Sequence, residues 1–210
     1  MTKEERLEAE RKRIYEMSSF EREYSGYQYI CGIDEVGRGP FAGPVVAGAV
    51  ILPKDCDILY INDSKKLSPK KREEVNGLIL EKALAWAVGI VDNTVIDEIN
   101  ILQATYEAMR RALKDLSIRP DILLNDAVTI PGVDIKQVPI IKGDAKSISI
   151  GAASIVAKVY RDNLMREYDE KYPGYGFATN MGYGTKEHIA ALKKMGPTPI
   201  HRKSFIHKYV

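Results

Sequence analysis

Five apolar runs along the chain predict five β-strands. Residues 29–34 form the first run, and the segment Gly37-Arg38-Gly39-Pro40 ends it with residues that break regular structure. Residues 45–52 carry only apolar side chains or glycine, as expected for an interior strand that is covered on both faces. The remaining predicted strands lie at residues 85–91, 122–124 and 138–141.

Helical spacing and capping residues place helices after these strands. Ser68 is a predicted N-cap, and Pro69 is the expected first residue of its helix. The segment 94–97 resembles a capping box and predicts the start of a second helix. The buried face of that helix is expected to contain Leu102, Tyr106, Met109 and Leu113. Two later helices are predicted at residues 149–168 and 185–195.

The order of these elements predicts the fold class. Short connections between the early strands favour antiparallel pairing, whereas the later alternation of strands and helices favours parallel pairing. We therefore predict an α/β fold with a mixed five-stranded sheet and helices on both faces. No internal repeat or low-complexity linker interrupts residues 27–210, which are expected to form one domain with a C-terminal helical segment.

The composition of the first residues differs from that of the rest of the chain. Its first 24 residues hold six Lys or Arg and seven Asp or Glu, among residues that favour helix and include few candidates for a core. We predict a charged, solvated helical extension at residues 1–26 that lies outside the core. An accessory substrate-binding helix is the alternative interpretation.

The net charge conceals two basic segments. The 210 residues carry 31 Lys+Arg and 29 Asp+Glu, a formal net charge of +2 that excludes a strongly basic chain. Residues 61–72, however, hold five Lys or Arg and one acid, and residues 181–210 hold six and one. Such segments bind phosphates, although an ordinary solvated face is the simpler explanation for either segment taken alone.

Cysteine content and apolar length limit the class of protein. Cys31 and Cys56 are the only cysteines, so neither a disulfide scaffold nor a zinc site is expected, and the histidines are expected to pack or cap. The longest apolar stretch, residues 41–53, is too short to span a bilayer. We expect a cytoplasmic protein with no membrane partner. A monomer is expected because no apolar stripe is left over for a dimer.

Acidic residues follow three of the predicted strands. Asp34 and Glu35 end the first strand and Asp126 follows the fourth, while Asp144 comes shortly after the fifth. If these strands are neighbours the carboxylates converge, and hard divalent cations would offset their repulsion. Two such ions, about 3.5–4 Å apart, stabilise the attacking and leaving oxygens of a phosphodiester. Adjacent strand residues face opposite ways, so the break at Gly37 must bring Asp34 and Glu35 together. The alternative for each acid is an ordinary turn residue.

Several blocks of sequence, taken in order, resemble one known family. They include Gly-Ile-Asp-Glu-Val-Gly-Arg-Gly-Pro at residues 32–40, Asp-Ser-Lys-Lys-Leu-Ser at 63–68 and Gly-Tyr-Gly-Thr at 182–185. Further blocks lie at residues 43–46, 100–105, 142–144, 152–158, 161–162 and 201–205. Over about residues 28–206 the chain thus resembles the type 2 ribonucleases H, in particular bacterial ribonuclease HII.

The resemblance implies an RNase H-like fold and an endoribonuclease with a two-metal site for Mg²⁺ or Mn²⁺. Such an enzyme hydrolyses the RNA strand of RNA–DNA hybrids. It also cuts 5′ of ribonucleotides embedded in duplex DNA, as in ribonucleotide excision during DNA repair, and leaves 3′-OH and 5′-phosphate ends. The catalytic, metal-binding residues map to Asp34, Glu35, Asp126 and Asp144. The substrate-binding residues map to Gly37, Arg38, Gly39 and Tyr183, with Lys65 and Lys66 on the nucleic-acid backbone.

The chain departs from the family pattern at a few positions. Asn125 precedes the third carboxylate where an apolar residue is expected, and Ala127 follows it in place of Gly. Met181 stands where the family often has Lys. Asp162 is a rival fourth ligand, although a surface ion pair within its helix would also explain it. Two rival functions are a nuclease of the same fold that cuts DNA, and a protein that binds hybrids without cutting them.

Overall fold

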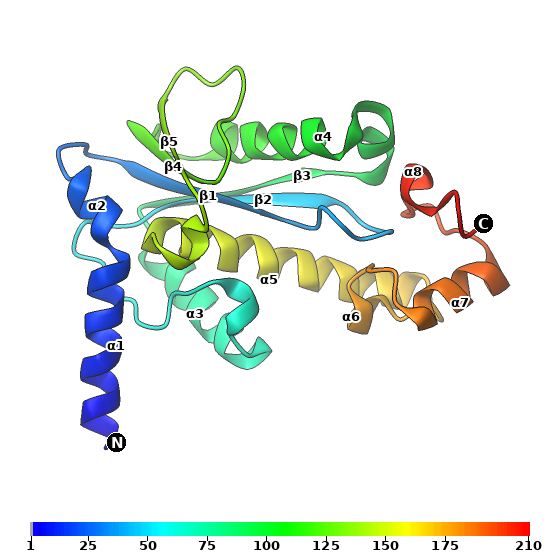
Figure 1. Ribbon diagram of the computed structural model, residues 1–210, viewed down its shortest axis with the longest axis horizontal. Helices are drawn as coiled ribbons and strands as arrows, with labels where there is room; N and C mark the ends of the chain where they lie inside the picture. Colours follow the sequence, from blue (N-terminus) through cyan, green and yellow to red (C-terminus); the bar gives the residue numbers. More distant parts are fainter. Residues whose placement is uncertain (1) are drawn as a thin grey trace.

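The predicted strands form one mixed sheet in the order β3-β2-β1-β4-β5 (Figure 1). The computed structural model describes residues 2–210. β1 (Ile30–Val36) and β2 (Val45–Ile51) pair antiparallel, as do β2 and β3 (Ala85–Val91). β4 (Ile122–Asp126) pairs parallel with both β1 and β5 (Lys136–Ile140). The predicted change from antiparallel to parallel pairing is confirmed.

Helices cover both faces of this sheet. α4 (Asn93–Asp115) lies on one face, and α3 (Pro69–Lys82) and α5 (Ile148–Lys171) lie on the other (Figure 1). The shorter elements are α1 (Lys3–Met17), α2 (Ser19–Glu23), η1 (Ser64–Lys66), η2 (Gly143–Ala145), α6 (Phe177–Asn180), α7 (Lys186–Met195) and α8 (Lys203–Ile206). Within residues 2–210, no helix is long and apolar enough to cross a membrane.

α5 lies directly against the two central strands because glycines leave room for its backbone. A Cβ atom on Gly32 of β1 would lie 2.0 Å from the carbonyl carbon of Ser149. A Cβ atom on Gly48 of β2 would lie 2.4 Å from the carbonyl oxygen of Ala153. Both distances are far below van der Waals contact, so any larger residue would push the helix away from the sheet.

The start and the buried face of α4 differ from the prediction. Asp92, not Thr94, is the N-cap, and its side chain accepts from the Val95 N–H. Asn100 has a φ of 66°, which kinks the helix and rotates the residues around it. Leu102 is therefore 41% exposed, although Met109 is buried as predicted. Helical spacing assumes an unbroken helix, so the pattern could not foresee this rotation.

The N-terminal helices dock on the body of the protein through a few side chains, so the prediction that this segment lies outside the core is wrong, although most of α1 is exposed as predicted. Ile14 and Met17 are buried in the cluster beneath α3 and α5. Glu21 of α2 accepts a hydrogen bond from the Ser147 hydroxyl at 2.5 Å and another from the Ser149 N–H at 3.0 Å. A few apolar side chains and one carboxylate thus join this charged segment to the start of α5. A domain boundary at residue 26 stays a prediction.

Two glycine substitutions test how closely α4 approaches the sheet. Gly89→Ala should lower the free energy of unfolding by about 3 kcal/mol or more, because its Cβ would lie 1.9 Å from the Ala108 carbonyl oxygen. The control is Gly77→Ala in α3, where nothing lies within 4 Å, and where alanine should add about 0.5–1 kcal/mol. Urea unfolding measures both changes. Equal stability of the Gly89→Ala variant and the wild type would contradict the close contact.

Candidate active site

Two of the predicted carboxylates lie side by side at the ends of neighbouring parallel strands. The register of β1 and β4 pairs Ile33 with Asn125, so Asp34 and Asp126 follow at the same level. Asp126 is paired in turn with Ile140, the last residue of β5. The sheet therefore brings together residues that are more than 90 positions apart in the sequence.

A tight turn after β5 brings the fourth acid to the same edge. Lys142 adopts the left-handed conformation, with a φ of 58°, and begins η2. The Gly143 N–H donates to Asp126 Oδ1 at 2.7 Å, which fixes the orientation of that carboxylate. Asp144, the next residue, is half-buried beside it.

The predicted acids lie close enough together for the charge of one to act on the next. Burial and the neighbouring Glu35 raise the pKa of Asp34 well above its usual value, and Asp126 adds to this shift. Burial likewise raises the pKa of Glu35, opposed by the Arg38 guanidinium. The negative charge of Asp126 raises the pKa of both Asp34 and Glu35, so Asp126 lies near both of them.

Asp144 belongs to the same electrostatic group. Burial raises its pKa, and the carboxylates of Asp63 and Asp126 raise it further, whereas Lys65 lowers it. Of the predicted basic contacts, Lys65 is thus close enough to act on the acids. Lys66 is exposed beside a hollow that Lys146 also lines.

The predicted break at Gly37 is present, but it comes too late to bend β1 at Asp34 and Glu35. β1 stays paired with β2 through Val36, and the turn at Gly37, with a φ of 90°, comes only afterwards. A hydrogen bond joins Asp34 to Ser154 of α5, whereas Glu35 contacts Arg38 Nη1 at 3.3 Å. The two carboxylates influence each other across the end of a regular strand. The break at Gly37 therefore does not itself bring the two side chains together, as the sequence analysis expected it to do.

The donor chemistry of this group fits a hard divalent cation. As the side chains stand, no three His, Cys, Asp or Glu residues among residues 2–210 are gathered closely enough to share one ion. The neighbouring carboxylates nevertheless raise the pKa of Asp34 and that of Asp144, so a cation among these acids would relieve their repulsion. Their oxygen atoms are the ligands that Mg²⁺ and Mn²⁺ prefer.

Two of the predicted substrate-binding residues, Gly39 and Tyr183, lie next to each other. A Cβ atom on Gly39 would lie 3.6 Å from Cε1 of Tyr183, so the tyrosine ring packs beside the glycine. Tyr183 is 45% exposed, and Arg38 and Gly39 are exposed as well. The Phe41 N–H donates to the Gly182 carbonyl at 2.7 Å and joins the two loops.

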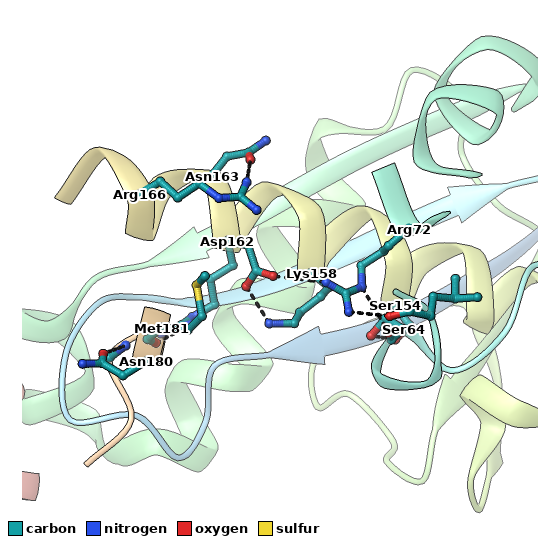
Figure 2. Close-up of polar contacts among 12 residues, drawn as sticks. Ser64, Arg72, Ser154, Lys158, Asp162, Asn163, Arg166, Asn180 and Met181 are labelled. Carbon is teal, nitrogen blue, oxygen red and sulfur yellow. Dashed lines mark hydrogen bonds and ion pairs between the residues drawn. The ribbon is translucent and has the colours of Figure 1, made fainter. Parts of the chain in front are cut away.

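Asp162, the rival fourth ligand, is engaged elsewhere. It is buried between Lys158, at 2.5 Å, and Arg72, at 3.4 Å (Figure 2). Arg72 also donates to the carbonyl of Ser64, and the Ser64 and Ser154 hydroxyls are 3.0 Å apart (Figure 2). This network fastens the loop that carries Lys65 to α5.

The departures at Asn125 and Ala127 have a structural account. Asn125 is fully buried, and its Nδ2 donates to the Val128 carbonyl and to Gln137 Oε1. It therefore holds the loop between β4 and β5. Ala127 has a φ of 56°, a left-handed conformation that glycine adopts more easily than alanine.

A pair of buried histidines lies against the main chain of Tyr183. The Thr198 N–H donates to His201 Nδ1 at 2.9 Å, so the proton of a neutral His201 is on Nε2. That nitrogen lies 3.0 Å from His188 Nε2, and His188 Nδ1 lies 2.9 Å from the Tyr183 carbonyl. Burial lowers the pKa of His188, and it lowers that of His201 to about 4. Both rings are neutral packing groups, as expected from the sequence.

Ser154 is a site residue that the sequence analysis did not single out. Its hydrogen bond lowers the pKa of Asp34, the most deeply buried of the acids. Its signal in the sequence is its position in the block 152–158, one of those that carry the family resemblance, where its small neighbours by themselves predict packing on a sheet.

The histidine pair predicts a loss of stability in acid. A histidine in the unfolded chain binds a proton near pH 6.5, whereas His201 in the folded protein does so near pH 4. The unfolded state therefore binds more protons between these values, and the free energy of unfolding should fall as the pH drops from about 6.5 towards 4. Urea unfolding should show a shallower pH dependence for His201→Gln than for the wild type. The exposed His207→Gln is the control, and equal slopes for His201→Gln and the wild type would refute the assignment.

The raised pKa of Asp34 predicts a stabilising substitution. Since folding disfavours the ionised form, stability falls as the pH rises from the ordinary Asp value to the folded-state value. At pH 7 Asp34→Asn removes this penalty and should raise the thermal midpoint by about 3 °C or more. Asp55→Asn, an exposed site with the same change of charge, should leave it unchanged. A lower midpoint for Asp34→Asn would show that its hydrogen bonds outweigh the repulsion.

Comparison with known proteins identifies the family. The family described as Ribonuclease HII matches residues 31–208. Ribonuclease HII of Lachnoclostridium phytofermentans is 66% identical over 202 residues, 96% of this chain and 80% of the relative. That of Bacillus subtilis is 59% identical over 191 residues, 90% of this chain and 74% of the relative.

A solved structure confirms the predicted RNase H-like fold. Ribonuclease H2 from Pyrococcus horikoshii OT3 superimposes with a TM-score of 0.72 at 28% identity, and the match covers 87% of this chain and 97% of that one. Sequence and fold therefore agree that the chain belongs to the ribonuclease HII family.

Proposed function

We propose that this protein cuts 5′ of ribonucleotides embedded in duplex DNA, as well as the RNA strand of RNA–DNA hybrids, and leaves 3′-OH and 5′-phosphate ends. Membership of the ribonuclease HII family supports an endoribonuclease that acts on RNA in hybrids. The observation that carries the finer proposal is the position of Asp126, level with Asp34 on the paired strand and held by the Gly143 N–H beside Asp144, next to an exposed surface that contains Arg38 and Tyr183.

We assign the metal-binding and catalytic role to Asp34, Glu35, Asp126 and Asp144. When bound there, Mg²⁺ or Mn²⁺ ions would supply Lewis-acid stabilisation of the attacking and leaving oxygens. The contribution of the chain is orientation. The Gly143 N–H holds Asp126, and the Ser154 hydroxyl holds Asp34. Such supporting hydrogen bonds fix the direction in which a ligand offers its oxygen.

We assign recognition of the ribonucleotide to Gly37, Arg38 and Gly39, and contact with the next sugar to Tyr183. The 2′-OH is the group that distinguishes RNA from DNA, and a close backbone loop can reach it where bulky side chains cannot. Lys65 and Lys66 are exposed near η2, where they would contact phosphates. The group of four acids argues against a protein that only binds hybrids. Carboxylates beside a phosphate repel it unless cations lie between them.

The proposed activity fits a role in ribonucleotide excision during DNA repair, carried out by a cytoplasmic monomer. The competing proposal of a DNA-cutting nuclease differs in its substrate alone. An all-DNA duplex therefore separates the two.

The test is cleavage of a DNA duplex that contains one ribonucleotide, with Mg²⁺, with Mn²⁺ and with EDTA. We expect a cut on the 5′ side only when a metal is present. Asp126→Asn should lose more than about a hundredfold in rate, since removing a group that merely orients a metal ligand already costs 10- to 100-fold. The matched control is Asp55→Asn, which removes an exposed carboxylate and should cut normally.

Three outcomes would overturn the proposal. One is an uncut single-ribonucleotide duplex with every metal, and another is full activity of Asp126→Asn. The third is equal cutting of the all-DNA duplex, which would favour the DNA nuclease. Tight binding of hybrids in EDTA, without cleavage under any condition, would favour the binding protein.

A further inference from the structure

Two fully buried arginines lie beneath the loop assigned to ribonucleotide recognition. Arg161 of α5 and Arg202, directly before α8, each have 0% of their surface exposed. They are the largest completely buried side chains among residues 2–210. Among residues 2–210, neither arginine forms a salt bridge with a carboxylate. Buried charges without an acidic partner are costly, so their presence needs a physical reason.

Both guanidinium groups bind main-chain carbonyls instead of acids. Arg161 donates to the carbonyls of Pro44 at 3.0 Å, Met181 at 2.9 Å and Ala42 at 3.2 Å. Arg202 donates to those of Gly43 at 3.0 Å, Arg38 at 2.9 Å and Gly37 at 2.5 Å. Five of these six carbonyls belong to residues 37–44, and the sixth lies two residues before Tyr183.

The loop is shaped to fit over these groups. A Cβ atom on Gly37 would lie 2.2 Å from Nε of Arg161, and one on Gly43 would lie 3.3 Å from its Nη2. These glycines thus let the main chain of the loop lie directly against the guanidinium group of Arg161. Because the fork of an arginine holds several acceptors in fixed directions, it constrains a loop in a way that a lysine ammonium cannot.

The charges of the two arginines are only partly compensated under this surface. Burial lowers the pKa of Arg161 to about 10 and that of Arg202 to about 9, and the acids Asp162 and Asp97 oppose this only in part. Both groups are therefore charged at neutral pH. Positive charge in a poorly solvated place raises the potential at the surface above it, which favours an anionic ligand there.

We propose that Arg161 and Arg202 are positioning residues that hold residues 37–44 and the Tyr183 turn in the conformation that receives the ribonucleotide. This inference rests on the proposed function, which assigns Gly37, Arg38, Gly39 and Tyr183 to the substrate. The arginines touch no substrate atom themselves. They act through the main chain that they hold.

Lysine variants test the proposal because they keep the charge and lose the fork. In Arg202→Lys and Arg161→Lys, the KM for a duplex with one ribonucleotide should rise about tenfold or more, while kcat stays within about threefold. Ile79→Ala is the control. It empties buried volume in α3 and is expected to lower stability at least as much while leaving KM unchanged.

Hydrogen exchange provides a measurement that needs no substrate. In the free wild type, residues 41–43 donate three main-chain hydrogen bonds, so the peptide 37–44 should exchange slowly. In Arg202→Lys or Arg161→Lys it should exchange about tenfold faster, whereas Ile79→Ala should leave the local rate unchanged.

The outcomes separate this inference from the proposed function. If the wild type cuts but the folded lysine variants keep its KM, the positioning role is wrong and the function stands. If the wild type does not cut, the function fails, and equal exchange in wild type and variants would remove the positioning role as well. Should neither variant fold, unprotected exchange of residues 37–44 in the wild type would overturn the proposal on its own.

Discussion

The site depends on the close contact of α5 with the central strands. Gly32 and Gly48 allow the helix backbone to lie against β1 and β2, within a distance that no other residue would permit. The helix begins beside Asp144 and carries Ser154 past Asp34. Further along it presents Arg161 to the loop after β1. One packing contact therefore positions the acids, their hydrogen-bond partners and the support for the recognition loop.

Gathering acids at the edge of a sheet works against folding, and the structure offsets this cost locally. Arg38 lies against Glu35, the field of Lys65 acts on Asp144, and a main-chain N–H holds Asp126. These partners reduce the repulsion without removing it, so the site keeps a negative potential that favours cations. The formal net charge of +2 is the sum of this acidic site and basic segments elsewhere.

Buried polar groups that hold main-chain carbonyls recur around the site. His188 reaches the carbonyl of Tyr183, and the guanidinium of Arg202 reaches those of Gly37 and Arg38. On the opposite side, Glu21 binds the first turn of α5 and joins the N-terminal helices to the body. Loops lack the repeating hydrogen bonds of helices and strands, so side chains from distant segments supply what a rigid loop needs.

The sequence by itself determined the strands along the chain, the change from antiparallel to parallel pairing, the acids at the strand ends and the family, because alternation, turn residues and contiguous motifs are local properties. Which strands are neighbours in the sheet came only from the structure. The sequence did not determine that Leu102 is exposed, that the N-terminal helices dock or that Asp162 is engaged by Arg72. The docking of the N-terminal helices and the Arg72–Asp162 pair depend on contacts between remote residues, as does the contact of Arg202 with Gly37, which is 165 positions away. A side chain that binds main-chain atoms leaves no pattern of its own in the sequence, since any residue type offers the same carbonyl. Only the tertiary structure could identify its partner.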